Sequence, residues 1–225
     1  MLHKLLLDLK SIWKTLFFMA VIAFGVLPLI CRYQSMGADL SMALGSTLKQ
    51  TQLVLPAVSA IPVAMLLRFQ LEEGCSEPLH AIPMVSQRTP WTLLLTELLL
   101  LIVYTLPLFW LYMRQFGIFL WQEWLRTMVQ GFFLQNLAFA AGYLTHFSLS
   151  GLGVQILAIG TMQLPLYDVD AAGSLFYTVN IYSAISEFQP RLWEPMRVLI
   201  VMACGIAFWC IGARQTKYFL ERRNR

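Results

Sequence analysis

Long apolar runs alternate with short polar segments along the chain, and these runs predict membrane-spanning helices. A hydrocarbon layer of about 30 Å needs about 20 residues of α-helix, because the helix rises about 1.5 Å per residue. We predict six spans on this basis, at residues 15–31, 50–67, 91–113, 127–145, 147–166 and 198–213. The fourth and fifth are the least apolar, since they contain the amides Gln130, Gln135, Asn136, Gln155 and Gln163.

The composition agrees with this pattern. Hydrophobic residues make up 58% of the chain and charged residues 12%, whereas about a quarter of the residues in a soluble domain are charged. A soluble core of 225 residues could not bury so much apolar surface. We therefore expect an all-α membrane protein with six transmembrane helices.

The first 14 residues predict an amphipathic helix that precedes the first span. Its apolar side consists of Leu2, Leu5, Leu6, Leu9, Ile12, Trp13 and Leu16, which recur at helical spacing. Such a helix lies in the membrane interface, either as a simple anchor or as a strut that contacts a cytoplasmic partner. The domains we expect are thus an interfacial helix at 1–14 and a six-helix transmembrane domain at 15–225. The first apolar run is long for a cleaved signal peptide, and no small-residue cleavage site follows it.

The distribution of lysine and arginine predicts the orientation, because cytoplasmic loops carry an excess of both. Placing both termini in the cytoplasm puts Lys4, Lys10, Lys14, Arg68, Arg88, Arg214, Lys217, Arg222, Arg223 and Arg225 inside. The outside then holds Arg32, Lys49, Arg114, Arg126, Arg191 and Arg197. We expect a multi-pass protein of the cell membrane, of the bacterial plasma-membrane type. The net charge of +4 reflects this topology, and no basic face with interleaved aromatic residues indicates nucleic-acid binding.

The polar segment 68–90 carries the most specific pattern. Gly74 suits a left-handed helix end, and Ser76 can cap a new helix with Pro78 in its first turn. We expect Pro83 to end that helix after about two turns. The pattern predicts a short helix between two bends at the cytoplasmic surface.

This segment resembles the cytoplasmic loop of ABC-2 type transporter permeases, in which Glu-Glu-Gly-x-x-Glu-x-Leu-x-x-x-Pro links the second and third helices. The matching residues are Glu72, Glu73, Gly74, Glu77, Leu79 and Pro83. Pro78 departs from the family, which more often has a helix former there. The overall plan also resembles the type V exporter-like architecture of these permeases. The outer segment 167–195 would then hold re-entrant or interfacial helices, and an amphipathic extracellular loop is the alternative.

The resemblance implies a permease subunit that is not itself an enzyme. ATP and Mg would bind to a separate ABC ATPase subunit, and this chain would hold no cofactor. Its sequence contains no Gly-x-x-x-x-Gly-Lys-[Ser/Thr] phosphate-binding loop. The surface implied to couple to the ATPase comprises Glu72, Glu73, Gly74, Glu77, Leu79, His80, Ile82 and Pro83.

The resemblance also implies an exporter that works as a pair, either of two copies or of this chain and a paralogue. In relatives the second and fifth helices flank the pathway, which favours Ser59, Gln155, Thr161 and Gln163 as substrate contacts. Hydrogen bonds between helices are the alternative for these polar residues. Few charges lie within the spans, so we expect an amphipathic or hydrophobic cargo, such as a membrane-active peptide or a drug.

Several other features have competing interpretations. Glu97 lies about 9 Å into the third span, where an ion pair or hydrogen bond competes with a role in transport. The four cysteines lack metal-ligand spacing. A membrane scaffold or assembly protein is the alternative function. An intramembrane protease fits less well, because the prenyl-protease pattern needs arginine where this chain has Glu77.

Overall fold

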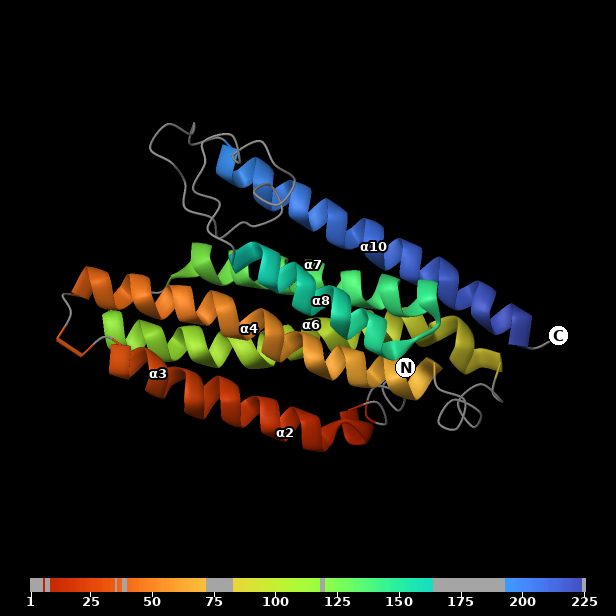
Figure 1. Cartoon of the computed structure of the whole chain (residues 1–225), viewed down its shortest axis with the longest axis horizontal. Coiled ribbons are helices and arrows are strands. Elements are labelled where there is room, and N and C mark those ends of the chain that lie inside the picture. Colours follow the sequence, from red (N-terminus) through yellow and green to blue (C-terminus); the bar gives the residue numbers. More distant parts are fainter. Residues whose placement is uncertain are drawn as a thin grey trace.

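A computed structural model describes residue 6 and residues 9–34, 36–37, 40–71, 83–117, 120–163 and 193–223. These described residues are almost all helical and contain no strand. The helices run along one long axis as an elongated bundle (Figure 1). In chain order the elements are α2 (Trp13–Val21), the π-helical turn η1 (Ile22–Val26), α3 (Leu27–Gln34), α4 (Leu40–Leu71), α6 (Pro83–Phe116), α7 (Trp121–Thr145), α8 (Ser148–Gln163) and α10 (Trp193–Arg223).

Three of these helical segments are long and apolar enough to cross a membrane. They are Trp13–Tyr33, Pro90–Phe116 and Val198–Thr216, at the positions of the first, third and sixth predicted spans. Helices α4, α7 and α8 lie at the other three predicted positions. Their described residues are not among the segments that are long and apolar enough to cross a membrane. The part of the chain that the structure describes is accordingly almost entirely helical, and its apolar helices suit a membrane.

Exposed apolar side chains form stripes at helical spacing on the outer helices. On α6 the stripe consists of Trp91, Leu95, Leu99, Ile102, Leu106 and Trp110. On α10 it includes Leu199, Met202 and Ile206. In water such stripes would be a large unfavourable surface, whereas hydrocarbon solvates them. These exposed stripes account for part of the high hydrophobic content of the chain.

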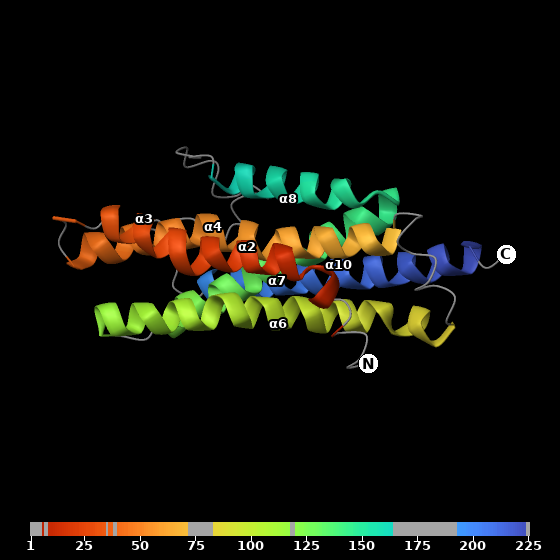
Figure 2. The ribbon, with the colours of Figure 1, turned by 90° about the horizontal axis from the view of Figure 1, so that it is seen from below.

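Helix α7 lies at the centre of the bundle and contacts α4, α6, α8 and α10. Figure 2 shows α6 and α8 on opposite sides, with α4 and α7 between them. Thirteen of the 25 residues of α7 are buried. This central position explains its low hydropathy, because a helix surrounded by protein does not need an apolar face toward lipid.

Small residues bring the helix backbones close together, as is typical of helices in membranes. A Cβ atom on Gly151 of α8 would stand 2.8 Å from the backbone oxygen of Ala138 in α7. A Cβ on Gly131 of α7 would stand 2.5 Å from Cδ2 of Leu101 in α6. These two contacts fix how α7 is aligned along its neighbours.

Proline accounts for the irregular turn within the first span. The N–H of Leu27 donates to the oxygen of Ile22, five residues back, which is the π-helical pattern of η1. Pro28 follows at once, and it has no N–H to donate and a ring that crowds the preceding turn. A wider turn relieves that crowding.

Pro83, which we expected to end a short helix, is the first residue of α6, and α6 continues through Pro90 to Phe116. Proline fits the first position of a helix because its missing N–H would have no partner there. The third helix therefore starts eight residues before the predicted span at 91–113. The short helix predicted from Ser76 lies outside the described residues, so it stays a prediction. The same holds for residues 167–192 of the outer segment 167–195.

The turn between α7 and α8 agrees with expectation, since His146 is exposed and sits at a left-handed helix end with φ of 56°. The other helices are longer than the predicted spans. Helix α4 begins at Leu40 and α10 extends from Trp193 to Arg223. Residues 9–11 are helical before a turn at Ile12, while most of the predicted interfacial helix lies outside the described residues.

The contact between α7 and α8 can be tested with two alanine substitutions on the same helix. We expect Gly151→Ala to lower the free energy of unfolding by about 1–3 kcal/mol, because the new Cβ meets a backbone oxygen that cannot yield. Gly153→Ala is the matched control, since no atom lies within 4 Å of its added Cβ. That change should be neutral or slightly stabilising, because alanine favours helix over glycine. Thermal unfolding in detergent micelles measures both, and equal effects would contradict the close contact.

Candidate functional site

The predicted coupling residues from Glu72 to Ile82 lie outside the described residues, and Pro83 is described only as the first residue of α6. Ser59 lies in α4 and Thr161 and Gln163 lie in α8, but their side chains are not among those described. Gln155 is buried, and its Nε2 donates a hydrogen bond of 3.0 Å to the backbone oxygen of Leu134. This bond joins α8 to α7, and an interhelical bond is the role that we gave as the alternative to contact with a substrate.

A group of buried polar side chains lies inside the bundle, around α7. Glu97 of α6, Gln135 and Asn136 of α7, and Gln155 of α8 are each at most 1% exposed. We call these four residues the polar layer. They lie at a similar level along the bundle because the contacts at Gly131 and Gly151 align α6, α7 and α8.

Glu97 and Gln135 occupy equivalent positions on either side of one contact. Helices α6 and α7 are antiparallel and touch at Leu101 and Gly131. Glu97 is one turn before Leu101 and Gln135 is one turn after Gly131, so both lie one turn further in the same direction along the bundle. The hydrogen bond from Gln155 to Leu134 places the third member at that level.

The polar layer presents oxygen atoms without hydrogen-bond partners. Both carboxyl oxygens of Glu97 are buried and unpaired, and so are Oδ1 of Asn136 and Oε1 of Gln155. The amide of Asn136 donates within α7, at 2.8 Å to the oxygen of Phe132. A buried ionised carboxylate without a partner costs several kcal/mol. The layer therefore favours donors and positive charge, and it disfavours anions.

The ion pair or hydrogen bond expected for Glu97 is not found among the described residues. Helix α6 instead carries the carboxyl group on the face that packs against α7. Arg114 of α6 and Arg126 of α7 lie near the ends of their helices, and the side chain of Arg88 in α6 is not among those described. Sequence spacing could not reveal this, because it does not show which face of α6 turns inward.

A second polar group joins α3, α4 and α6 at the end of the bundle away from the two termini. The hydroxyl groups of Thr51 and Tyr112 share a hydrogen bond of 2.5 Å. Thr51 also donates to the backbone oxygen of Thr47 at 2.7 Å, and the Cys31 thiol lies 3.9 Å from that oxygen. These bonds hold the side chain of Tyr112 in a fixed position.

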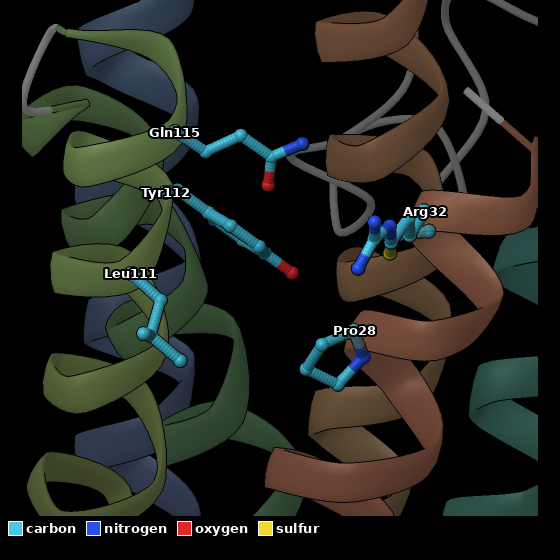
Figure 3. Close-up of a pocket in the computed structure, with 6 residues that line it drawn as sticks. Pro28, Arg32, Leu111, Tyr112 and Gln115 are labelled. Carbon is cyan, nitrogen blue, oxygen red and sulfur yellow. The ribbon is translucent and has the colours of Figure 1, made fainter. Parts of the chain in front are cut away.

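Beside this group lies a cavity of about 400 Å³ between α3 and α6. Its lining consists of Pro28, Cys31, Arg32, Leu111, Tyr112 and Gln115 (Figure 3). Analysis of the sequence missed this cavity, since Arg32 and Gln115 are far apart in the chain. Among the described residues, no group of three or more His, Cys, Asp or Glu side chains is arranged to hold a metal ion.

Comparison with known proteins assigns neither a family nor a function to the chain. No protein-family model matches the chain, and neither does any curated protein or solved structure. The functional argument therefore rests on the residues of this chain.

Replacing Glu97 tests whether its carboxyl group is buried without a partner. We expect Glu97→Gln to raise the free energy of unfolding by about 1–3 kcal/mol, because an amide of the same shape is never ionised. Glu123→Gln is the control, since Glu123 forms an ion pair with Arg126 at 2.5 Å in which both side chains are 20% exposed. Loss of that pair should lower stability by less than about 1 kcal/mol. Thermal unfolding in micelles measures both, and a lower melting temperature for Glu97→Gln would show that the carboxylate has a partner.

Proposed function

We propose that the chain is the membrane-spanning permease subunit of an ABC transporter of the ABC-2 type. It would cross the cell membrane six times with both termini in the cytoplasm. One observation carries the proposal beyond the sequence motif. Leu71 at the end of α4 and Pro83 at the start of α6 lie at the same end of the bundle as the start of α2 and the end of α10 (Figure 1). The Glu-Glu-Gly segment is thus joined to the bundle at the end that the charge distribution assigns to the cytoplasm.

The charges near that end support the orientation. Lys14, Arg68 and Arg214 are exposed near it, and the last turns of α10 add Arg222 and Arg223. An excess of basic residues on one side of a membrane protein is typical of its cytoplasmic face.

The two helices that flank segment 72–82 suit a mechanical role. Helix α4 has 32 residues and α6 has 34, and each runs without interruption from that end toward the opposite end. A displacement applied by an ATPase at the segment would be carried into the bundle along both helices. Helix α4 would pass that displacement to α7 and α8, and α6 would pass it to α7 and α10.

The cargo pathway would lie between two permease chains. At the centre of the described bundle Glu97, Gln135 and Asn136 are fully buried, so one copy is closed there by its own side chains. The partner is a second copy or a paralogue. A surface dominated by apolar side chains favours an amphipathic or hydrophobic cargo, such as a membrane-active peptide or a drug.

Purification of the assembled complex tests the partner. The full chain, tagged and extracted in mild detergent from the cells that produce it, should bring down an ATPase subunit with a phosphate-binding loop. Mass spectrometry of the intact complex gives the subunit ratio, expected as two permease chains and two ATPase chains. A preparation that contains no such ATPase would favour the scaffold or assembly alternative.

Substitutions in segment 72–82 test the coupling. We expect the double variant Leu79→Ala/Ile82→Ala to lower cargo-stimulated ATPase activity by roughly tenfold, as loss of apolar anchors at an interface commonly costs more than about 1.4 kcal/mol. The matched control is Leu144→Ala/Leu149→Ala, which changes two exposed leucines beside the α7–α8 turn at the same end. Membrane insertion should be unchanged in both. Equal ATPase activity in the two double variants would contradict the coupling role.

A further inference from the structure

The carboxyl group of Glu97 is fully buried inside the bundle. Neither of its oxygens forms a hydrogen bond. A carboxylate in such a place is strongly disfavoured, because nothing replaces the water that solvates it elsewhere. A bound proton removes the charge and needs no additional space. The burial of Glu97 therefore favours the neutral carboxylic acid.

The helices around Glu97 do not supply a compensating charge. Helix α6 packs against α4, α7, α10 and η1. Across the contact with α7, the residue opposite Glu97 is Gln135, and an amide carries no charge. Among the ionisable side chains that the structure describes in α6 and these neighbours, none forms a hydrogen bond or ion pair with Glu97. They are Arg68 of α4, Tyr104, Tyr112 and Arg114 of α6, Glu123, Arg126, Tyr143 and His146 of α7, and Cys204, Cys210 and Arg214 of α10.

An apolar cluster separates Glu97 from the end of the bundle at which α6 begins. Leu93 lies one turn before Glu97 on the same side of α6 and is 0% exposed. It belongs to a buried cluster with Leu66, Leu67 and Leu71 of α4 and with Phe139 and Tyr143 of α7. We call these six residues the Leu93 cluster. It excludes water from Glu97 while α4, α6 and α7 are packed together.

Glu97 is nevertheless close to that end. It lies about two turns beyond Pro90, where the apolar part of α6 begins. Leu71 of the Leu93 cluster is the last residue of α4, directly before segment 72–82. A displacement of that segment would therefore act first on the side chains that cover Glu97.

We propose that Glu97 is a proton-binding site that exchanges with water at the end of the bundle where α6 begins. While the Leu93 cluster is closed, Glu97 holds the proton as a neutral carboxylic acid. When the cluster separates and water enters, the O–H bond breaks, the proton passes to water and a solvated carboxylate remains. The site exists in the single chain. Only the control of proton release by segment 72–82 rests on the proposed function.

Infrared spectroscopy of the purified full chain in micelles tests the bound proton, because a protonated carboxyl group has a C=O band distinct from that of a carboxylate. At neutral pH we expect this acid band in the unaltered chain and its loss in Glu97→Gln. Glu123→Gln is the matched control and should keep the band, since Glu123 is paired with Arg126. Glu97→Asp should shift the band, which assigns it even if Glu97→Gln does not fold. An unaltered folded chain without the band, or a band that persists in Glu97→Gln, would overturn the proposal.

The pH dependence of unfolding gives an independent measurement. A glutamate in water ionises near about pH 4, so a proton held by Glu97 is released when the chain unfolds at neutral pH. As the pH rises from about 5 to about 7, the folding equilibrium constant of the unaltered chain should fall by up to about tenfold more per pH unit than that of Glu97→Gln. Thermal unfolding in micelles at several pH values measures both chains. Parallel pH dependences would contradict proton binding at Glu97.

Two alanine substitutions in α6 test the role of the Leu93 cluster. After transfer to D₂O, the acid band should shift as deuterium replaces the bound proton. We expect Leu93→Ala to speed this shift by roughly tenfold or more, because water gains access to Glu97. Leu108→Ala is the matched control, since Leu108 is also 0% exposed but lies beyond Glu97, in another apolar cluster. Equal exchange rates in the two variants would overturn the proposed route to water.

Exchange of sodium for choline at constant ionic strength separates a proton from a metal cation. Neither the acid band nor the melting temperature of the unaltered chain should change. A sodium-dependent rise in melting temperature that Glu97→Gln abolishes would assign the site to a metal cation and overturn the proposal. None of these measurements requires an ATPase partner, so their outcome is distinguishable from failure of the proposed function.

Discussion

The close contact of α7 with its neighbours is the interaction on which the rest of the structure depends. Helices in hydrocarbon gain little from burying apolar surface against one another, because the lipid is equally apolar. Close packing of backbones must hold them together instead. Gly131 lets α7 approach α6, and Gly151 lets α8 approach α7. The polar layer exists because these contacts bring α6, α7 and α8 into alignment.

The same constraint explains why the polar residues are inside and the large apolar residues outside. Trp91, Leu95 and Leu99 point outward on α6, while Glu97, which lies between Leu95 and Leu99 in the sequence, is fully buried. A carboxyl group on the outer stripe would face hydrocarbon directly, at a cost of at least about 2.5–3.5 kcal/mol. Placing it against α7 puts it among amide side chains, although neither carboxyl oxygen forms a hydrogen bond there.

The sequence located the helices, but it did not show how they pack against one another. Apolar runs located the spans at 15–31, 91–113 and 198–213, because length and hydropathy are local properties. The start of the third helix was placed eight residues too late, since proline suits both a helix start and a helix end. The cavity at Arg32 and Gln115 was missed because it depends on the packing of α3 beside α6, which no local pattern encodes.

Helix α6 connects segment 72–82, the polar layer and the cavity. It begins where segment 72–82 ends, carries Glu97 in the polar layer, and places Tyr112 and Gln115 in the cavity. A helix transmits displacement along its axis through its backbone hydrogen bonds, of which Pro90 and Pro107 each remove one in α6. Movement of its first turn by an ATPase would therefore shift the carboxyl group of Glu97 relative to α7. It would also shift the cavity wall formed by Tyr112 and Gln115 relative to α3.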